Sequence, residues 1–191
     1  MIQPISDPDV QILATLSASL APDYVSDADD PWIGSPFEWI LRVPSRTKGA
    51  VGEALVAGWA AAKGFDVVRS RNSDADRIIN GHRIEIKMST LWKNGGFKFQ
   101  QIRDQEYDYC LCVGLSPFDV QAWLLSKEVL NEFVIGHMGQ HTGATGRDTS
   151  WLSFQADRAF DWMEPYGDRL SDVERLLLTN GRGNFLVSEL I

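Results

Sequence analysis

Asp76, Glu85 and Lys87 are the residues whose types and spacing indicate chemistry in this chain. Between them, Asn80-Gly81 separates two short runs in which apolar and polar residues alternate. An Asn-Gly pair in this setting is the strongest short-range signal for a two-residue hairpin turn. With that turn, Asp76 faces Glu85 across the hairpin, with Cβ atoms roughly 4.5–5.5 Å apart. Lys87 lies on the same face because side chains alternate along a strand.

Two carboxylates that face one another repel, so they lower stability unless a positive group lies between them. A divalent cation supplies that charge, and Mg²⁺ takes carboxylate oxygens while it keeps several of its waters. We therefore expect a metal site at Asp76 and Glu85, with Lys87 as a neighbouring cation. The alternative is a solvated strand face, where acidic residues and lysines are common.

The segment before the hairpin predicts a helix over Gly49–Lys63, capped by Ser45 or Thr47 and ended by Gly64. Apolar residues cover every side of this segment, so we expect the helix to be largely buried. Between Lys48 and Lys63, Glu53 is the only charged residue. A buried carboxylate needs a partner, which is either the same metal site or a nearby arginine such as Arg46 or Arg71.

The rest of the chain predicts an alternation of strands and helices. We expect short helices over Asp9–Leu20 and Phe37–Leu41, and further helices over Phe99–Gln105, Lys127–Phe133 (capped by Ser126) and Ser171–Thr179. The expected strands are Asp66–Arg71, Ala75–Ile79, His82–Met88, Asp108–Leu115, Val120–Leu125 and Trp151–Gln155. This order indicates an α/β protein with residues 1–44 as an N-terminal helical and acidic extension and residues 45–191 as one globular domain.

Composition is that of an ordinary globular protein, with 44% hydrophobic and 23% charged residues in 191. No apolar run reaches the roughly 18 residues of a membrane span. Cys110 and Cys112 alternate on a predicted strand and lack the spacing of a zinc or redox motif. We therefore expect free thiols, a reducing cytoplasm and no membrane partner.

The net charge of −8 is unevenly distributed along the chain. Residues 1–40 carry seven acids and no Lys or Arg, whereas residues 41–103 carry twelve Lys and Arg against five acids. Residues 104–191 carry fourteen acids against six Lys and Arg. Phosphate binding depends on local positive charge, so the basic third, which contains the hairpin, is the segment expected to bind nucleic acid.

The order helix, three strands, helix, strand resembles the PD-(D/E)XK nuclease superfamily over residues 45–125. Glu53 would lie in the first helix, and Asp76, Glu85 and Lys87 on the second and third strands. Ala75 stands where the family often has proline. The resemblance implies a restriction-endonuclease-like core (αβββαβ) with a central mixed sheet flanked by helices. The strand Tyr109–Pro117 and the Trp-containing strand after it are most similar to type II restriction endonucleases.

The resemblance implies Mg²⁺-dependent hydrolysis of phosphodiester bonds in double-stranded DNA, with Mn²⁺ as a substitute and a homodimer as the assembly. Asp76, Glu85 and Glu53 would bind the metal ion, and Lys87 would orient the attacking water or offset negative charge. Asp74 is an alternative to Asp76 as the metal ligand. A repair or junction-cutting nuclease and a catalytically silent nucleic-acid-binding module are the alternative functions.

Two segments supply expected DNA contacts. The loop after the hairpin offers Lys93, Lys98, Gln101 and Arg103, of the residue types that contact phosphates and base edges. Its alternative is a solvated loop with Trp92, Phe97 and Phe99 anchored in the core. The Gly-rich loop of residues 136–150 is long and polar, and it adds His141 and Arg147.

Overall fold

The structure is a computed structural model that describes residues 8–24, 30–70, 74–138 and 149–180. By its contacts the chain divides into two compact units, residues 1–35 and 36–191. The first unit contains helix α1 (Pro8–Tyr24), which confirms the helix expected over Asp9–Leu20. The second unit contains every other element and the candidate site. The division into domains at residues 44 and 45 stays a prediction.

The second unit is built on a six-stranded mixed sheet with the order β1-β2-β3-β5-β6-β8. Its strands are β1 (Val67–Arg69), β2 (Arg77–Ile79), β3 (His82–Thr90), β5 (Tyr109–Leu115), β6 (Val120–Ser126) and β8 (Gly167–Arg169). Strands β3 and β5 are parallel, and every other neighbouring pair in this sheet is antiparallel. Strands β4 (Gly96–Ile102) and β7 (Ser150–Gln155) form a separate antiparallel pair.

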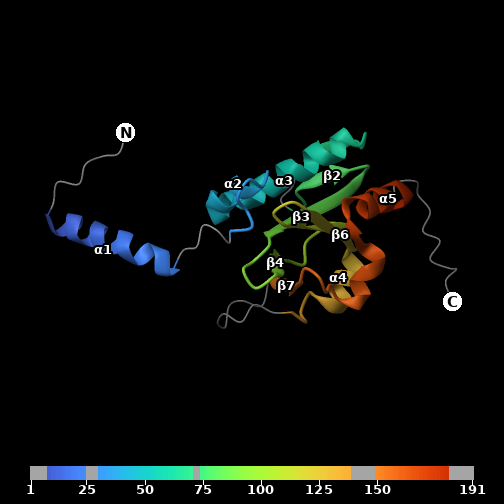
Figure 1. Cartoon of the computed structure of the whole chain (residues 1–191). Coiled ribbons are helices and arrows are strands. Elements are labelled where there is room, and N and C mark those ends of the chain that lie inside the picture. The colour runs from blue at the N-terminus through green and yellow to red at the C-terminus, as the bar shows by residue number, and fades with distance from the viewer. Residues whose placement is uncertain (1–7, 25–29, 71–73, 139–148, 181–191) are drawn as a thin grey trace. The chain divides into compact units, whose positions relative to one another are not determined.

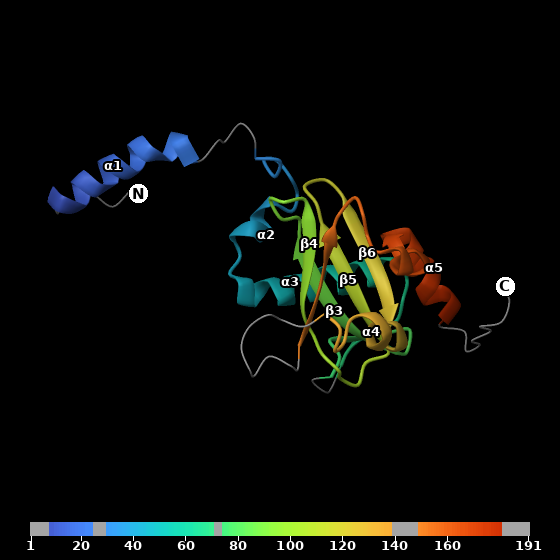
Figure 2. The same cartoon turned by 90° about the horizontal axis from the view of Figure 1, so that it is seen from below.

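Helices cover the sheet on both sides. Helix α3 (Ser45–Ala62), which follows the short α2 (Glu38–Arg42), packs mainly on β3, and α5 (Leu170–Asn180) packs on β6 and β8. Figure 1 shows α3 and α5 on one side of the sheet, with the β4–β7 pair and α4 (Lys127–Phe133) on the other. Figure 2, seen from the β4 side, places α3 behind the strands. A central mixed sheet flanked by helices is therefore confirmed.

The helix expected over Phe99–Gln105 is wrong, because this segment belongs mostly to strand β4. Phe97 and Phe99 are buried, while Lys98 and Gln100 between and after them are more exposed. That period of two matches a strand with one buried face, and β7 supplies its hydrogen-bonding partner. A strand therefore connects β3 to β5 where the αβββαβ order has a helix.

Helix α3 also differs from its prediction. Only Gly52, Val56 and Ala60, which recur every four residues along one side, are buried. Ala54 and Leu55 are exposed, and the other apolar residues off this side are at most half-buried, so the helix packs by a single stripe. Pro44 precedes the helix without a side-chain cap from Ser45 or Thr47, and Gly64 follows it with φ of 83°. The expected C-terminal glycine is thus confirmed.

A large core lies between the sheet and the β4–β7 pair. It includes Phe97, Phe99, Trp123 and Phe154, whose rings lie 5.0–6.4 Å apart between centroids. Ser126 caps α4 by accepting a hydrogen bond from the backbone N–H of Val129, as predicted. In the described part of the chain, no helix has the length and apolar content needed to cross a membrane.

Candidate active site

The hairpin between β2 and β3 has the predicted register. Ile79 pairs with His82, Ile78 with Arg83 and Arg77 with Ile84. Asn80 and Gly81 form the turn with φ of 50° and 84°. Two successive positive φ values define a type I′ turn, whose twist matches that of the strands beside it.

Asp76 lies where β2 departs from β3. The backbone N–H of Asp76 donates to the carbonyl oxygen of Ile84 at 3.0 Å. Its carboxylate oxygen Oδ2 accepts from the backbone N–H of Ile86 at 2.8 Å. The side chain thus takes the place of a strand carbonyl and is fixed beside Glu85. Asp76 is outside β2 as the structure defines it, one residue before Arg77.

Glu85 and Lys87 form an ion pair on one face of β3. The Nζ of Lys87 is 2.6 Å from Oε1 of Glu85, and the two side chains are only 18% and 9% exposed. Burial raises the pKa of Glu85, the Lys87 charge opposes this rise, and Asp76 and Glu53 add to it. Burial lowers the pKa of Lys87, but attraction to Glu85 outweighs burial and the net shift is upward. Lys87 is therefore held as an ammonium ion.

Glu53 on α3 pairs with an arginine that the sequence reasoning did not name. Its Oε2 accepts from Nη1 of Arg77 at 3.0 Å. The same nitrogen donates to the backbone carbonyl of Asp76 at 2.7 Å. Alternation along β2 could have identified Arg77, because the residue after Asp76 must point to the opposite face, where α3 packs. In the described part of the chain Arg46 is not its partner, and the other arginine considered, Arg71, lies outside the described residues.

Two carboxylate oxygens of the candidate site are available to bind a cation. Oδ1 of Asp76 and Oε2 of Glu85 have no hydrogen-bond partner in the described part of the chain. No group of three or more His, Cys, Asp or Glu side chains in that part is arranged to hold a metal ion. Mg²⁺ typically binds through one or two carboxylates, with waters and substrate phosphates as its other ligands. Asp76 and Glu85 fit that pattern, and Glu53 contributes negative charge nearby.

The segment between β4 and β5 runs beside β3, where the backbone N–H of Asp108 donates to the carbonyl of Arg83 at 2.9 Å. Tyr107 in this segment is buried, and burial together with the charges of Cys110 and Glu85 raises its pKa, so the phenol stays protonated. Cys110 and Cys112 are buried free thiols on one face of β5, as expected. Their strand pairs in register with Glu85 and Lys87 of β3.

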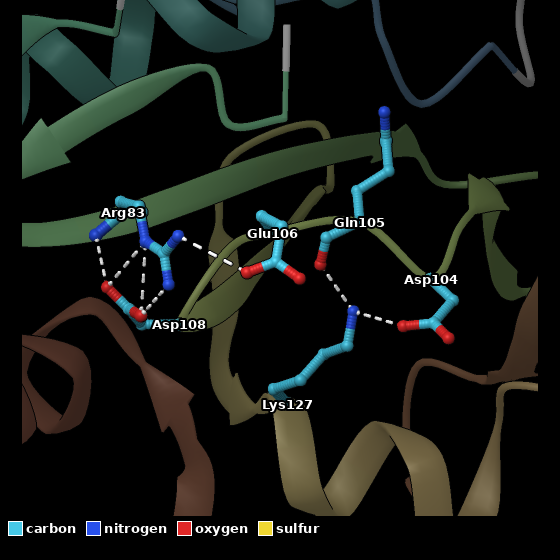
Figure 3. Close-up of polar contacts among 6 residues, drawn as sticks. All are labelled: Arg83, Asp104, Gln105, Glu106, Asp108 and Lys127. Carbon is cyan, nitrogen blue, oxygen red and sulfur yellow. Dashed lines mark hydrogen bonds and ion pairs between the residues drawn. The ribbon is translucent and has the colours of Figure 1, made fainter. Parts of the chain in front are cut away.

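Ion pairs fasten that segment on both sides (Figure 3). Arg83 contacts Asp108 at 2.7 Å and Glu106 at 3.6 Å. Lys127 contacts Asp104 at 2.7 Å, donates to the carbonyl of Gln105, and lies over the ring of Tyr107. These contacts surround a cavity of about 480 Å³ whose lining does not include Asp76, Glu85 or Lys87. Both of its cations are already paired, so we assign these contacts a structural role.

The described residues predicted to contact DNA lie within β4 and shortly before and after it in the sequence. Lys93 is exposed in the turn before β4, and Lys98 lies on β4 with its ammonium over two tryptophan rings. Gln101 and Arg103 are exposed near the end of β4, and Gln101 has a left-handed φ of 59°. Of the aromatic residues expected in the core, Phe97 and Phe99 are buried, whereas Trp92 is 48% exposed. His141 and Arg147 lie outside the described residues.

Comparison with models of known protein families gives no match, and no curated protein matches the sequence. Among solved structures, the chain is similar to a bacterial homing endonuclease with a TM-score of 0.46 and 14% identity. The similarity covers 72% of this chain and 94% of that one. The site is accordingly interpreted from its own residues.

Proposed function

We propose that this protein is a Mg²⁺-dependent endonuclease that hydrolyses phosphodiester bonds of double-stranded DNA. The observation that carries the proposal is the arrangement at the hairpin. Asp76 is fixed beside β3, and the buried Glu85 forms an ion pair with a protonated Lys87. Carboxylates beside a lysine, at the point where two strands separate, suit an anionic substrate that binds together with a divalent cation.

Asp76 and Glu85 would hold the ion through their unpaired oxygens, and Glu53, which is paired with Arg77, would contribute negative charge nearby. The chemistry that Mg²⁺ supplies when bound is activation of water and neutralisation of charge on the phosphate. Lys87 would stabilise the negative charge that builds on the phosphate, because its raised pKa keeps it positive. A general-base role would require the neutral amine, which this environment disfavours.

We further propose that the enzyme is of the type II restriction kind and acts as a homodimer. A dimer places two sites on opposite strands of a two-fold symmetric sequence. The proposal rests on the resemblance of the strands Tyr109–Pro117 and Val120–Leu125 to that class. It is tested by the pattern of products, because a restriction enzyme gives discrete bands and a junction-cutting or repair enzyme gives structure-selective nicks.

The test is to incubate the purified full chain with plasmid and Mg²⁺ and to compare it with Asp76→Asn, Glu85→Gln and Lys87→Met. The cleavage rate of each variant should be roughly 10²- to 10³-fold lower than that of the wild type, the usual effect of removing one transition-state contact. Lys87→Arg keeps the charge and should retain more activity than Lys87→Met. Asp157→Asn, a change of the same kind at an exposed position, is the matched control.

The folded state of each variant is checked by thermal melting. Full plasmid cutting by folded Asp76→Asn or Glu85→Gln would contradict the assignment of the site. Wild-type protein that binds DNA but never cuts it, with Mg²⁺ or Mn²⁺, would favour the catalytically silent binding module.

A further inference from the structure

Trp92 is an exposed aromatic ring two residues beyond the end of β3, the strand that carries Glu85 and Lys87. It is 48% exposed, although tryptophan is highly buried on average. It lies in the turn that connects β3 to β4. The ring therefore has a large face available to a ligand, at a point where the chain reverses direction.

The turn that carries Trp92 is rigid. The backbone N–H of Trp92 donates to the carbonyl of Gly96, and the N–H of Gly95 donates to the carbonyl of Trp92, each at 2.9 Å. Gly95 has φ of 78°, a conformation that glycine adopts without strain. Gln155 of β7 donates from its side-chain amide to the backbone carbonyl of Asn94 at 2.8 Å when the amide nitrogen faces this turn. A ring displayed on a fixed turn loses little conformational entropy when it binds.

A cation and polar groups surround the same ring. The Nζ of Lys98 is 5.5 Å from the centroid of Trp92 and 3.7 Å from that of Trp151. Lys98 has no carboxylate partner in the described part of the chain. Beside them is a cavity of about 330 Å³ whose lining includes Trp92, Asn94, Lys98, Ser153 and Gln155, and no acidic residue. The surface thus combines an aromatic face, hydrogen-bonding groups and an unpaired positive charge.

This surface is connected to the strand that carries Glu85 and Lys87. The backbone N–H of Lys98 donates to Oγ of Ser89 at 2.9 Å. Ser89 lies two residues beyond Lys87 on the same face of β3, about 7 Å along the strand. Lys98 is thus attached to β3 at a residue two positions beyond Lys87, on the face that carries Glu85 and Lys87.

We propose that Trp92 stacks on the face of an unpaired nucleobase, while Lys98 binds a phosphate of the same strand. The inference rests on the proposed function, because it assigns the substrate contact beside that site. Aromatic rings and lysines in a groove without acids are the features by which proteins bind single-stranded nucleic acid. In a duplex the grooves expose only base edges. The base must therefore belong to a single-stranded segment.

The test measures binding of a short oligothymidylate in EDTA, so that no strand is cut, with an abasic strand of equal length as the second probe. Trp92→Ala should raise the Kd for oligothymidylate roughly 5- to 150-fold and leave the Kd for the abasic strand unchanged. Trp92→Phe, which keeps an aromatic face, should retain most of the affinity. Trp39→Ala is the matched control, since Trp39 on α2 is equally exposed at 50% and should not affect binding.

Lys98→Ala should weaken binding to both probes and reduce the salt slope of log Kd by about 0.7, the value for one phosphate contact on a single strand. The inference is overturned if folded Trp92→Ala binds oligothymidylate like the wild type, or loses affinity equally for the abasic strand. Equal losses for oligothymidylate and a fully paired duplex would also overturn it. Plasmid cleavage is a separate readout, so failure of the nuclease proposal and failure of the stacking site are distinguishable.

Discussion

At the scale of single residues, the candidate site combines buried charges of opposite sign. Glu85 and Lys87 are two residues apart on β3, and each is shielded from water. Burial favours the neutral form of each group, whereas their mutual attraction favours the charged forms. The balance leaves Lys87 positive and makes Glu85 easier to protonate than a free glutamate. A cation bound at Glu85 would favour the ionised carboxylate and so oppose its protonation.

The Glu53–Arg77 pair gives a prediction about stability. Glu53→Ala and Arg77→Ala should each lower the free energy of unfolding, because each leaves a partly buried charge without its partner. The loss of unfolding free energy in the double variant should be smaller than the sum of the two single losses by about 1–2 kcal/mol. This coupling is modest because both side chains are partly exposed. Urea unfolding of the four proteins measures this coupling. Strictly additive losses would mean that the pair contributes nothing to the fold.

Asp108 gives a prediction about pH. Burial would raise its pKa, but hydrogen bonds from the side chain and backbone of Arg83 outweigh burial and lower it below its usual value of 3.8. A carboxyl whose pKa is lower in the folded state stabilises the fold above the pKa of the unfolded state, and this contribution disappears as pH falls through the folded pKa. The wild type should therefore be more stable than Asp108→Asn at neutral pH, and the difference should shrink below pH 3.8.

The measurement for this prediction is urea unfolding across a pH series. Asp157→Asn removes an exposed carboxylate that has no ion pair or hydrogen bond in the described part of the chain, and it should give a difference that hardly varies with pH. A wild-type advantage that grows toward acid pH would contradict the role assigned to Arg83.

At the scale of elements, β4 and α3 show how the two faces of the sheet are covered. The ring of Phe97 on β4 packs directly over Gly114 of β5, where a Cβ atom would lie 2.6 Å from the ring. The other face is covered through the buried stripe of α3, where Gly52 brings the helix backbone close to Met88 of β3. Small residues thus allow close approach on each side of β3 and β5, whose pairing fixes the site.

Two glycine substitutions test these packing arrangements. Gly114→Ala should lower the free energy of unfolding by about 1–3 kcal/mol, because the added methyl group overlaps a buried ring. Gly58→Ala on α3 should instead raise it by up to about 1 kcal/mol, since alanine is the better helix former. Among the described residues, no atom beyond the chain neighbours and the backbone of α3 lies within 4 Å of the added methyl group at Gly58. Urea unfolding of both variants provides the measurement, and a tolerated Gly114→Ala would contradict the packing of β4 on β5.

At the scale of the whole molecule, opposite charges are separated along the chain. The basic third, residues 41–103, contains α3, β1 to β4 and all the candidate catalytic residues. The acidic third that follows supplies β5 to β8 and helices α4 and α5. The positive field therefore comes from the elements that carry the site, despite a total charge of −8.

The salt dependence of duplex DNA binding tests this separation. Lys93→Ala and Arg103→Ala should each reduce the slope of log affinity against log salt by about 0.9, the value for one phosphate contact. Arg169→Ala, which removes an exposed arginine on β8 in the acidic third, should leave the slope unchanged. Fluorescence anisotropy in EDTA measures all three. Equal flattening by Arg169→Ala would place the DNA elsewhere.

Local signals in the sequence were sufficient to predict the hairpin. Asn80-Gly81 determines a type I′ turn because both residues tolerate positive φ, and the turn then sets the register of β2 and β3. Alternation places Glu85 and Lys87 on one face. Helix α5, the cap at Ser126 and the two free cysteines also follow from patterns within a few residues of each position.

Tertiary structure decided the features that depend on distant segments. Strand β4 exists as a strand because β7, some fifty residues later, supplies its hydrogen bonds. Arg77 pairs with Glu53 only because α3 packs on the face of the sheet to which Arg77 points. The exposure of α3 and of Trp92 likewise depends on which segments cover them. The sequence of a segment determines how its polar and apolar residues alternate. Which of those residues are buried depends on the other segments that pack against it in the fold.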